Sequence, residues 1–207
     1  FNKKNPIKKN NKINTKTYKT ISKEKQLDEL IKKLNEKSVI AVDTETSSLN
    51  PQEADLVGIS LCYEANEAFY IPVGHTEKTE LKKDIVLKKL KPLLEDPSIK
   101  KVGQNIKYDF IIFKNHGIEL SSVEDTMLLS YTLDAGNNRH NMDTLSELHL
   151  GHKTISYKDL VGTGKKQLNF SEVDLKSATE YAAEDADITL RLYKVLSDRV
   201  EKEKLNK

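Results

Sequence analysis

Four acidic residues occupy positions where a fold of strands and helices would present them to a ligand: Asp43 and Glu45 at the end of an apolar run, Asp109 early in a helical stretch, and Asp185 within YAAEDADITL (181–190). Hard cations such as Mg²⁺ and Mn²⁺ prefer carboxylate oxygens. Four converging carboxylates without lysine partners would repel one another unless cations neutralised them. Two cations about 3.5–4 Å apart form the clamp for an in-line phosphoryl displacement, which is the chemistry this pattern predicts.

Local spacing supports this convergence at the strand end. Asp43 and Glu45 are two residues apart on a predicted strand, so their carboxylates point to one face. Ligands bind at strand ends in open α/β sheets. Asn105 precedes Asp109 by four residues, so we expect the two to share a helix face. A carboxylate near a helix start is also favoured by the helix dipole, which leaves a purely structural interpretation of Asp109 open.

The acidic stretch near the C-terminus divides between helix faces. Tyr181 and Asp185 are i and i+4 and therefore neighbours on one face. Asp187 is rotated from Asp185 by about 200°. We expect Asp187 to accept a hydrogen bond from a neighbouring loop and Glu184 to be a solvated helix position.

Apolar periodicity places these residues on an α/β layer fold around a mixed sheet. The short connection at 64–66 predicts an antiparallel pair of strands, and residues 152–170 are expected to form a loop. Strands are predicted at 38–45, 55–64, 67–75 and 100–105, and helices at 22–37, 84–95, 106–117, 141–151 and 172–204, with 121–136 as a strand or turn followed by a helix.

Composition narrows the class of protein. With 207 residues, 37% of them hydrophobic, the chain suits one domain with a buried core. Its single cysteine, Cys62, excludes an internal disulfide and a cysteine-rich metal site, and is expected to be buried and reduced. His149 and His152 lack the further ligands that zinc would need. No apolar run approaches the ~20 residues of a membrane span, and no signal-peptide pattern is present.

Residues 1–20 carry seven lysines and no acidic residue. Such an arm can attract nucleic acid, and the simpler alternative is a solvated linker. Because the segment lacks apolar periodicity, we expect it to be disordered or loosely packed.

Three segments in order, VDTETSSL (42–49), VGQNIKYD (102–109) and YAAEDADITL (181–190), resemble the three exonuclease motifs of the proofreading 3′–5′ exonuclease domain of bacterial DNA polymerase I, a family A polymerase. The similarity extends over about residues 25–200. A related branch has histidine where Glu180 stands, so Tyr181 indicates the tyrosine branch. The resemblance implies a ribonuclease H-like fold with a mixed five-stranded sheet flanked by helices. It divides the chain into a basic flexible linker, 1–20, and the exonuclease domain, 21–207.

The resemblance also implies catalytic roles. Asp43, Glu45 and Asp185 would bind one of two divalent metal ions, Mg²⁺ or Mn²⁺. Asp43 would bridge to the second ion, which Asp109 would reach directly or through water. Tyr181 and Glu45 would orient the attacking water.

The substrate contacts follow from the same resemblance. Leu49 would wedge beside the terminal base, and Tyr157 would stack on a base. Ordinary packing is the alternative for both residues, and a surface salt bridge is the alternative for Arg139. The residues expected to hold the strand are Thr46, Leu49, Gln104, Asn105, Tyr108, Arg139 and Tyr157.

The implied activity is a metal-dependent 3′–5′ exodeoxyribonuclease that removes 3′-terminal nucleotides from single-stranded or frayed DNA. Its expected partners are the 3′ end of single-stranded DNA and a polymerase domain in the full-length chain. The expected state is a monomer in the cytoplasm, at the nucleoid, or in an organelle of bacterial descent. Phe1 and the charged tail RVEKEKLNK fit an excised domain. The alternatives are an exoribonuclease of the ribonuclease D kind, a catalytically silent structural or DNA-binding module, and an unrelated acidic-surface protein.

Overall fold

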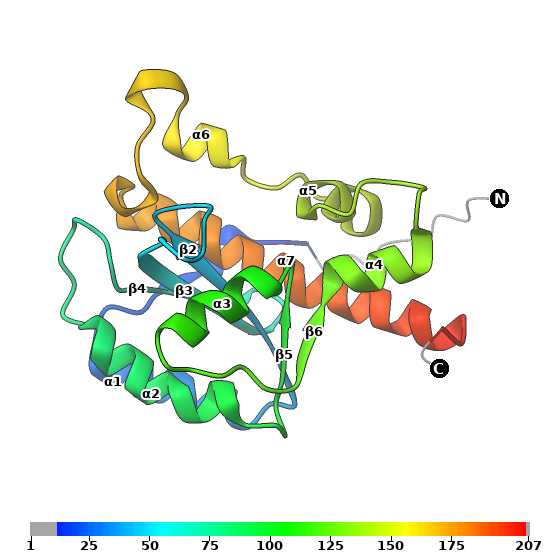
Figure 1. Ribbon diagram of the computed structural model, residues 1–207, viewed down its shortest axis with the longest axis horizontal. Coiled ribbons are helices and arrows are strands. Elements are labelled where there is room, and N and C mark those ends of the chain that lie inside the picture. Colours follow the sequence, from blue (N-terminus) through cyan, green and yellow to red (C-terminus); the bar gives the residue numbers. More distant parts are fainter. Residues whose placement is uncertain (1–11, 206–207) are drawn as a thin grey trace.

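A six-stranded mixed sheet in the order β1-β4-β3-β2-β5-β6 forms the centre of the molecule (Figure 1). The computed structural model describes residues 12–205, apart from the side chain of Lys165. Strands β2, β5 and β6 are parallel, and β3 is antiparallel to both of its neighbours. The predicted α/β fold and the predicted antiparallel pair are therefore confirmed. The strands are β1 Lys19–Thr20, β2 Val39–Thr46, β3 Leu56–Glu64, β4 Glu67–Pro72, β5 Lys100–Gly103 and β6 Val123–Asp125.

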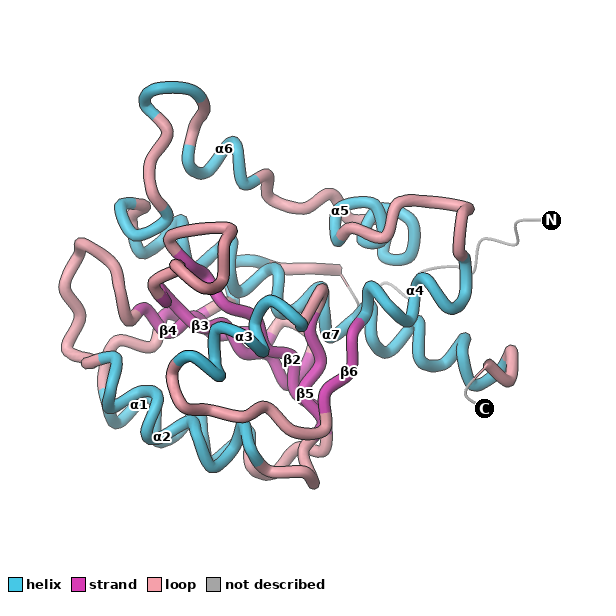
Figure 2. The backbone as a smooth tube through the Cα atoms, in the orientation of Figure 1, coloured by secondary structure: helices cyan, strands magenta, loops and turns pink. Residues whose placement is uncertain are grey.

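Helices cover both faces of this sheet (Figure 2). One hydrophobic cluster joins α1, α2 and α3 to Ile40 and Val42 of β2. A second hydrophobic cluster joins α7 to Ala41. Ala41 lies between Ile40 and Val42 in sequence, so its side chain points to the opposite face of the sheet. The helices are α1 Glu24–Leu34, α2 Lys83–Glu95, α3 Lys107–Asn115, α4 Thr126–Asp134, α5 Met142–Leu145, α6 Tyr157–Val161 and α7 Leu175–Lys202.

Small side chains bring α7 close to the sheet. Ala178, Ala182, Ala183 and Ala186 are fully buried in the clusters that join this helix to the strands. Because alanine adds only one methyl group beyond the backbone, a helix with this face can pack closely on the strands beneath it. The same 28-residue helix carries Tyr181. The distance of the helix from the sheet therefore also determines how close the Tyr181 side chain lies to the strands.

The segment Thr15–Thr20 is ordered, so the expectation of loose packing is wrong for these residues. Thr15–Thr17 forms a 3₁₀ turn, and β1 pairs in parallel with β4, which raises the expected five strands to six. The buried Tyr18 donates a hydrogen bond to Asp187 Oδ2 at 2.8 Å. This contact could not be predicted from the sequence, because a hydrogen bond between polar atoms leaves no apolar periodicity. Residues 1–11 of the predicted tail lie outside the described residues.

Other expectations need smaller changes. The predicted loop at 152–170 contains α6, and the helix predicted at 141–151 continues from α5 into a π-helical turn at Ser146–Leu150. Gly151 ends that turn with a left-handed φ of 63°, which glycine adopts without strain. Cys62 is buried, as predicted. Within residues 12–205, no helix is both long and apolar enough to cross a membrane.

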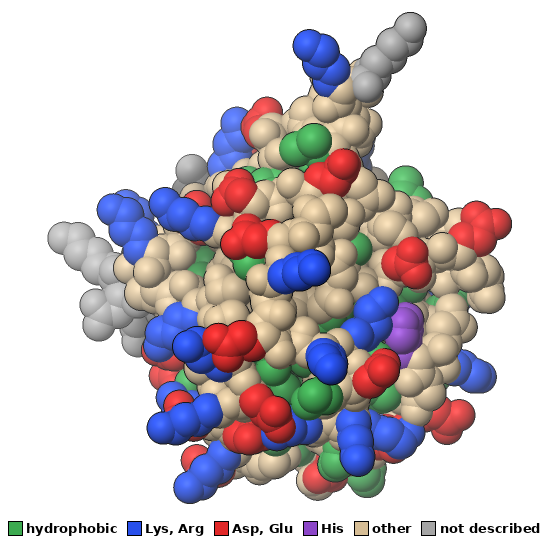
Figure 3. Space-filling model, turned by 90° about the vertical axis from the view of Figure 1, so that its left-hand side faces the viewer, with side chains coloured by type: hydrophobic (Ala, Val, Ile, Leu, Met, Phe, Trp, Pro, Cys, Tyr) green, Lys and Arg blue, Asp and Glu red, His purple; other side chains and the backbone are tan. Residues whose placement is uncertain are grey.

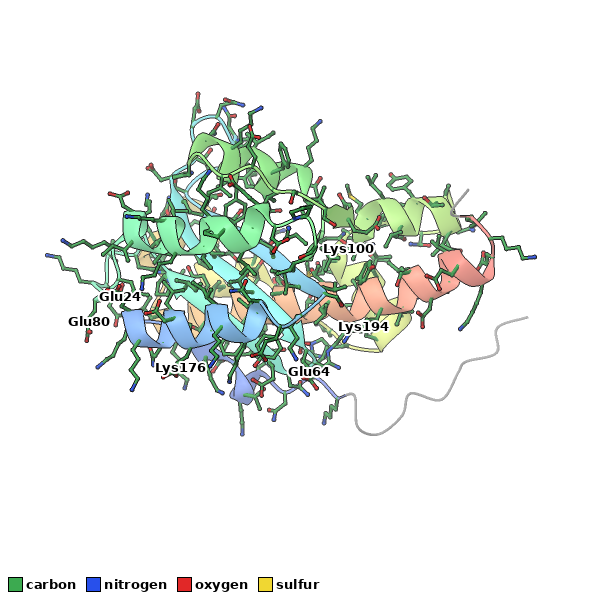
Figure 4. The ribbon with its side chains drawn as sticks, turned by 90° about the horizontal axis from the view of Figure 1, so that it is seen from below. Glu24, Glu64, Glu80, Lys100, Lys176 and Lys194 are labelled. Carbon is green, nitrogen blue, oxygen red and sulfur yellow. The ribbon has the colours of Figure 1, made fainter. Side chains whose placement is uncertain are left out.

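Charges of both signs are interspersed on the face at the left of Figure 1 (Figure 3). On the underside, Glu24 lies at the start of α1 (Figure 4), and its carboxylate is 2.8 Å from Lys89 Nζ of α2. Exposed pairs of this kind contribute little to stability, because solvent and salt screen them. The buried faces, rather than these surface pairs, therefore hold the helices on the sheet.

Candidate metal centre

Three carboxylates meet where β2 ends beneath α7. Asp43, Glu45 and Asp185 each offer an oxygen, and these oxygens all lie within 4.8 Å of one another. Asp43 and Glu45 continue the face of β2 that begins with Ala41, the face packed on α7. The register shift between Glu45 and Thr46 ends the regular pairing with β3 immediately after them, as β-bulges often do beside active sites.

Asp109 approaches the cluster from the opposite side of β2. It is buried in the first turn of α3, and its Oδ1 accepts hydrogen bonds from the Thr44 backbone N–H at 2.9 Å and from Thr44 Oγ1 at 2.5 Å. Its oxygens lie outside the three-carboxylate group. Asn105 precedes the helix, which begins at Lys107, so the predicted shared helix face is wrong.

Burial, with like charges added to it, raises the pKa values of the clustered carboxyls. Burial, followed by the charge of Asp185, raises the pKa of the Asp43 carboxyl well above its ordinary range, although a long 3.5 Å contact from Ser60 Oγ opposes the shift. Burial and the charges of Asp43, Asp185 and Asp109 raise the pKa of Glu45. Burial and the charge of Glu184 raise the pKa of Asp185. Each carboxylate therefore destabilises the ionised form of its neighbours.

The donor set fits a hard divalent cation. Two oxygens on opposite sides of a six-coordinate Mg²⁺ lie about 4 Å apart, which is compatible with the spacing of the three carboxylates. Among the described residues, no lysine or arginine forms an ion pair with Asp43, Glu45 or Asp185. A bound cation would supply the positive charge that this part of the chain does not.

An aromatic wall stands beside the carboxylates. The ring of Tyr181 lies 6.0 Å from Phe170 and 5.9 Å from Tyr157, which is 41% exposed. Burial and the charges of Asp185, Glu45 and Asp43 raise the pKa of the Tyr181 phenol, so its hydroxyl stays protonated. Tyr157 therefore packs against this aromatic cluster and also exposes part of its ring to solvent.

The base of the wall depends on a glycine. Tyr70 is fully buried, and its ring lies 6.4 Å from that of Phe170. A Cβ on Gly58, which pairs with Glu45 across the ladder, would lie 2.0 Å from the Tyr70 hydroxyl oxygen. No spacing rule in the sequence connects Gly58, Tyr70 and Phe170, and the sequence analysis missed all three.

The loop after β2 presents Leu49 to solvent. Leu49 is 96% exposed, so its side chain packs little against the rest of the protein. The alternative of ordinary packing therefore does not describe this residue. Thr46 Oγ1 lies 2.5 Å from the Tyr108 hydroxyl, which also donates to the Ser48 carbonyl. Thr46 and Tyr108 thus hold the loop that carries Leu49.

The turn between β5 and α3 is fixed from the neighbouring strand. Asn105 has a left-handed φ of 59°, a conformation enriched in asparagine, and its N–H donates to Asp125 Oδ1 at 3.0 Å. Gln104 Nε2 donates to the His140 carbonyl at 2.7 Å, and its Oε1 accepts from Thr126 Oγ1. Asp125, which the sequence analysis missed, also caps α4 by accepting from the Met127 N–H.

The remaining acids of the C-terminal stretch are engaged elsewhere. Asp187 accepts a hydrogen bond from the backbone N–H of Asn66, in the turn between β3 and β4, which confirms the predicted loop contact. Glu184 is buried rather than solvated, so that prediction is wrong. Its oxygens accept from the Ile155 N–H at 2.6 Å and lie 2.9 Å from His152 Nε2. These contacts tie the segment before Tyr157 to α7.

The fold and this site define an α/β protein with a carboxylate cluster at a strand end, in which Glu45 is buried and Asp43 and Asp185 are partly exposed. A family model described as 3′–5′ exonuclease, of the type found in A-family DNA polymerases, matches residues 18–201. The chain belongs to this 3′–5′ exonuclease family, and as a member it is a nuclease.

Similar proteins agree with the family. DNA polymerase I of Pseudomonas aeruginosa is 45% identical over 190 residues, which cover 89% of this chain and 21% of that protein. DNA polymerase I of Rhizobium leguminosarum is 44% identical over 203 residues, covering 88% and 20%. The chain therefore spans about a fifth of the length of these relatives.

Solved structures share the fold. Brucella melitensis NrnC has a TM-score of 0.68 at 23% identity, with 91% of this chain and 82% of that chain covered. Trypanosoma brucei RNase D has a TM-score of 0.72 at 21% identity, covering 86% and 64%. These likenesses confirm the predicted ribonuclease H-like fold.

Proposed function

We propose that this chain is a metal-dependent 3′–5′ exodeoxyribonuclease that hydrolyses the 3′-terminal phosphodiester of single-stranded or frayed DNA. The observation that carries the proposal is the group of three carboxylates within 4.8 Å, with raised pKa values and no cationic side chain paired to them within residues 12–205. Family membership supplies the reaction, and the relatives named DNA polymerase I favour DNA.

In this proposal the four acids hold two divalent cations, Mg²⁺ or Mn²⁺. Asp43, Glu45 and Asp185 would hold one ion, and Asp43 and Asp109 would hold the second. Asp109 already has one oxygen occupied by Thr44, which leaves the other for an ion or a bridging water. When bound, such ions lower the pKa of the attacking water and stabilise the charge that develops on the phosphate.

The remaining side chains position the reactants. The Tyr181 hydroxyl is protonated and can hydrogen-bond to the attacking water, while the Glu45 carboxylate accepts a hydrogen bond from it. The exposed Leu49 separates the terminal base from its neighbour, and Tyr157 offers a ring for stacking. Because an unpaired end costs less to separate than a paired one, mismatched termini are the favoured substrate.

A labelled single-stranded oligonucleotide with Mg²⁺ or Mn²⁺ tests the activity. The wild-type chain should shorten it from the 3′ end and release nucleoside 5′-monophosphates, and Asp43→Ala should not. Asp198→Ala is the matched control, because Asp198 is an exposed acid on α7. Equal activity of Asp43→Ala and wild type would reject this site.

Matched DNA and RNA strands test the substrate, because the 2′-OH is the group that distinguishes them. Faster removal of ribonucleotides would replace DNA by RNA in the proposal and leave the site in place. Calorimetric titration addresses the silent-module alternative: failure to bind Mg²⁺ or Mn²⁺ at millimolar concentration would reject the enzyme.

We propose further that the chain is the proofreading part of a longer DNA polymerase at the nucleoid. The support is that it matches about a fifth of each relative named DNA polymerase I. A primer with a 3′ mismatch, presented to the longer protein, should be trimmed before extension, and Asp43→Ala in that protein should extend the mismatch instead.

A further inference from the structure

An exposed tyrosine on α4 is held flat against a buried histidine. Tyr131 is 51% exposed, and its ring centroid lies 3.8 Å from that of His140 at an interplanar angle of 31°. His140 is buried, and its Nδ1 is hydrogen-bonded to Ser130 Oγ at 2.8 Å. One face of the Tyr131 ring is therefore covered and oriented. Its exposed area belongs to the edge and the other face.

A positively charged side chain lies next to this stack in the sequence and is not engaged in an ion pair with any described residue. Arg139 is exposed and directly precedes His140. The chain has two other arginines, Arg191 and Arg199, and both are paired with aspartates. Within the described part of the chain, no ion pair engages the Arg139 guanidinium, so the surface salt bridge considered for it is absent.

This pair of features is joined to the candidate metal centre by hydrogen bonds. The His140 carbonyl accepts from Gln104, which follows β5, and Gln104 also accepts from Thr126 at the start of α4. Strands β2, β5 and β6 are parallel, so their carboxyl ends lie at one edge of the sheet. The carboxylates lie at the end of β2, and α4 leaves from the end of β6. Tyr131 and Arg139 therefore extend the site along that edge.

We propose that Tyr131, backed by His140, forms a second stacking platform beside Arg139, which the resemblance already assigns to the strand, and that this platform binds a nucleotide of the single strand upstream of its 3′-terminal residues. This inference rests on the proposed function, because it takes the same strand as ligand. Aromatic rings stack on any base, so the platform needs no sequence preference. The guanidinium suits either the phosphate of that nucleotide or the face of a base. A ring already fixed by His140 loses little freedom on binding.

The platform can be mapped with 2-aminopurine, whose fluorescence falls when it stacks. A 12-nucleotide DNA strand carries the probe at successive positions from the 3′ end, in Ca²⁺ to suppress hydrolysis. We expect one internal position to be quenched by the wild-type chain and by Tyr131→Phe, and not by Tyr131→Ala. The affinity for the 12-mer should fall about tenfold in Tyr131→Ala, as expected for one lost stacking contact, while the KM for a dinucleotide and kcat stay unchanged.

Leu128→Ala is the matched control, because Leu128 is 59% exposed on the same helix and lies outside the stack. Unchanged affinity and quenching in Tyr131→Ala would overturn the proposal, and so would an equal loss in Leu128→Ala, which would show that the loss does not depend on the stack of Tyr131 on His140. A wild-type chain that fails to hydrolyse the strand in Mg²⁺ or Mn²⁺ but keeps the Tyr131-dependent quenching would reject the proposed function and support the platform.

Discussion

Asp185 and Asp187 stand two residues apart on one helix and have opposite surroundings. Asp187 is fully buried with complete partners: it accepts from the Tyr18 hydroxyl, from the Asn66 N–H, and from Arg191 Nε at 2.8 Å. Asp185 faces two other carboxylates and has no ion pair among the described residues. A buried charge needs a compensating partner. Where the chain supplies a cationic partner, as for Asp187, the carboxylate serves the fold; Asp185 has the Tyr181 hydroxyl as a hydrogen-bond partner but no cation among the described residues, which is why we propose it as a metal ligand.

Glu184 lies between these two cases. It is as buried as Asp187, and its partners are the Ile155 N–H and His152 rather than an arginine. Three nearly consecutive acids thus belong to a carboxylate cluster, a loop attachment and a buried ion pair. The helical rotation of about 100° per residue points each side chain in a different direction.

The strongest way to test the contrast is a pair of isosteric substitutions. Asp185→Asn removes a charge from the ligand site, and we expect the exonuclease kcat to fall about 10³-fold, since electrostatic stabilisation by bound metal is worth several kcal/mol. Asp187→Asn should leave kcat within about twofold at a temperature where the protein is folded. Single-turnover degradation of a labelled strand measures both. Similar losses in the two variants would remove the distinction.

Stability should show the reverse order. Asp187→Ala leaves Arg191 buried without its carboxylate, and we expect the free energy of unfolding to fall by about 3 kcal/mol. Asp185→Ala removes a like charge from the cluster and should not lower stability in the absence of metal. Urea denaturation followed by circular dichroism measures both, with Asp198→Ala as a surface control. A larger loss in Asp185→Ala than in Asp187→Ala would contradict the comparison.

Metal should stabilise the protein more at high pH. The folded-state pKa is about 8 for Asp43 and for Asp185, against about 3.9 in an unfolded chain. The metal-free folded state therefore holds protons that the unfolded state has lost, and stability falls as pH rises from about 4 through about 8. Cations compete with these protons, so their affinity rises over the same window.

We therefore expect Mn²⁺ at about 100 times its Kd to add about 2.7 kcal/mol to the free energy of unfolding at pH 8.5, and the same concentration to add less at pH 6. Urea titrations with Mn²⁺ or with EDTA measure the difference, and Asp187→Asn should retain it. A metal effect that does not change between the two pH values would argue against carboxylates with raised pKa as the ligands.

The smallest expected effect on the rate comes from removing the hydroxyl of Tyr181, the uncharged side chain beside the carboxylates. Tyr181→Phe keeps the ring in the aromatic wall and removes one hydroxyl, so kcat should fall about tenfold, the equivalent of one hydrogen bond in the transition state. Mn²⁺ affinity by calorimetry should be unchanged. Tyr193→Phe on the same helix is the control, because that ring lies under Lys100 rather than beside the carboxylates. An unaltered rate would remove Tyr181 from the reaction.

Short-range periodicity allowed much of this site to be predicted. The i, i+2 spacing of Asp43 and Glu45 on β2 and the i, i+4 spacing of Tyr181 and Asp185 on α7 are fixed by strand and helix geometry alone. Both pairs point as predicted, towards a common place.

Contacts that join distant segments through polar atoms could not be predicted in this way. The hydrogen bonds from Thr44 to Asp109 and from Tyr18 to Asp187 leave no repeat in the sequence. Glu184 was misjudged for the same reason: its partner Ile155 lies in a segment without regular periodicity. Whether a polar residue is buried depends on which distant groups contact it, and these contacts are specified only in the folded chain.

The alanine face of α7 has a consequence for the choice of cation. Ala182, Ala183 and Ala186 set the height of the helix above the strands, and Asp185 is carried at that height. A bulkier residue at any of them would lift the helix and widen the opening between Asp185 and β2. If the carboxylates hold a cation as proposed, the ionic radius that fits would depend on methyl groups outside the donor set, and substitution of these alanines could change the metal preference without altering a single ligand.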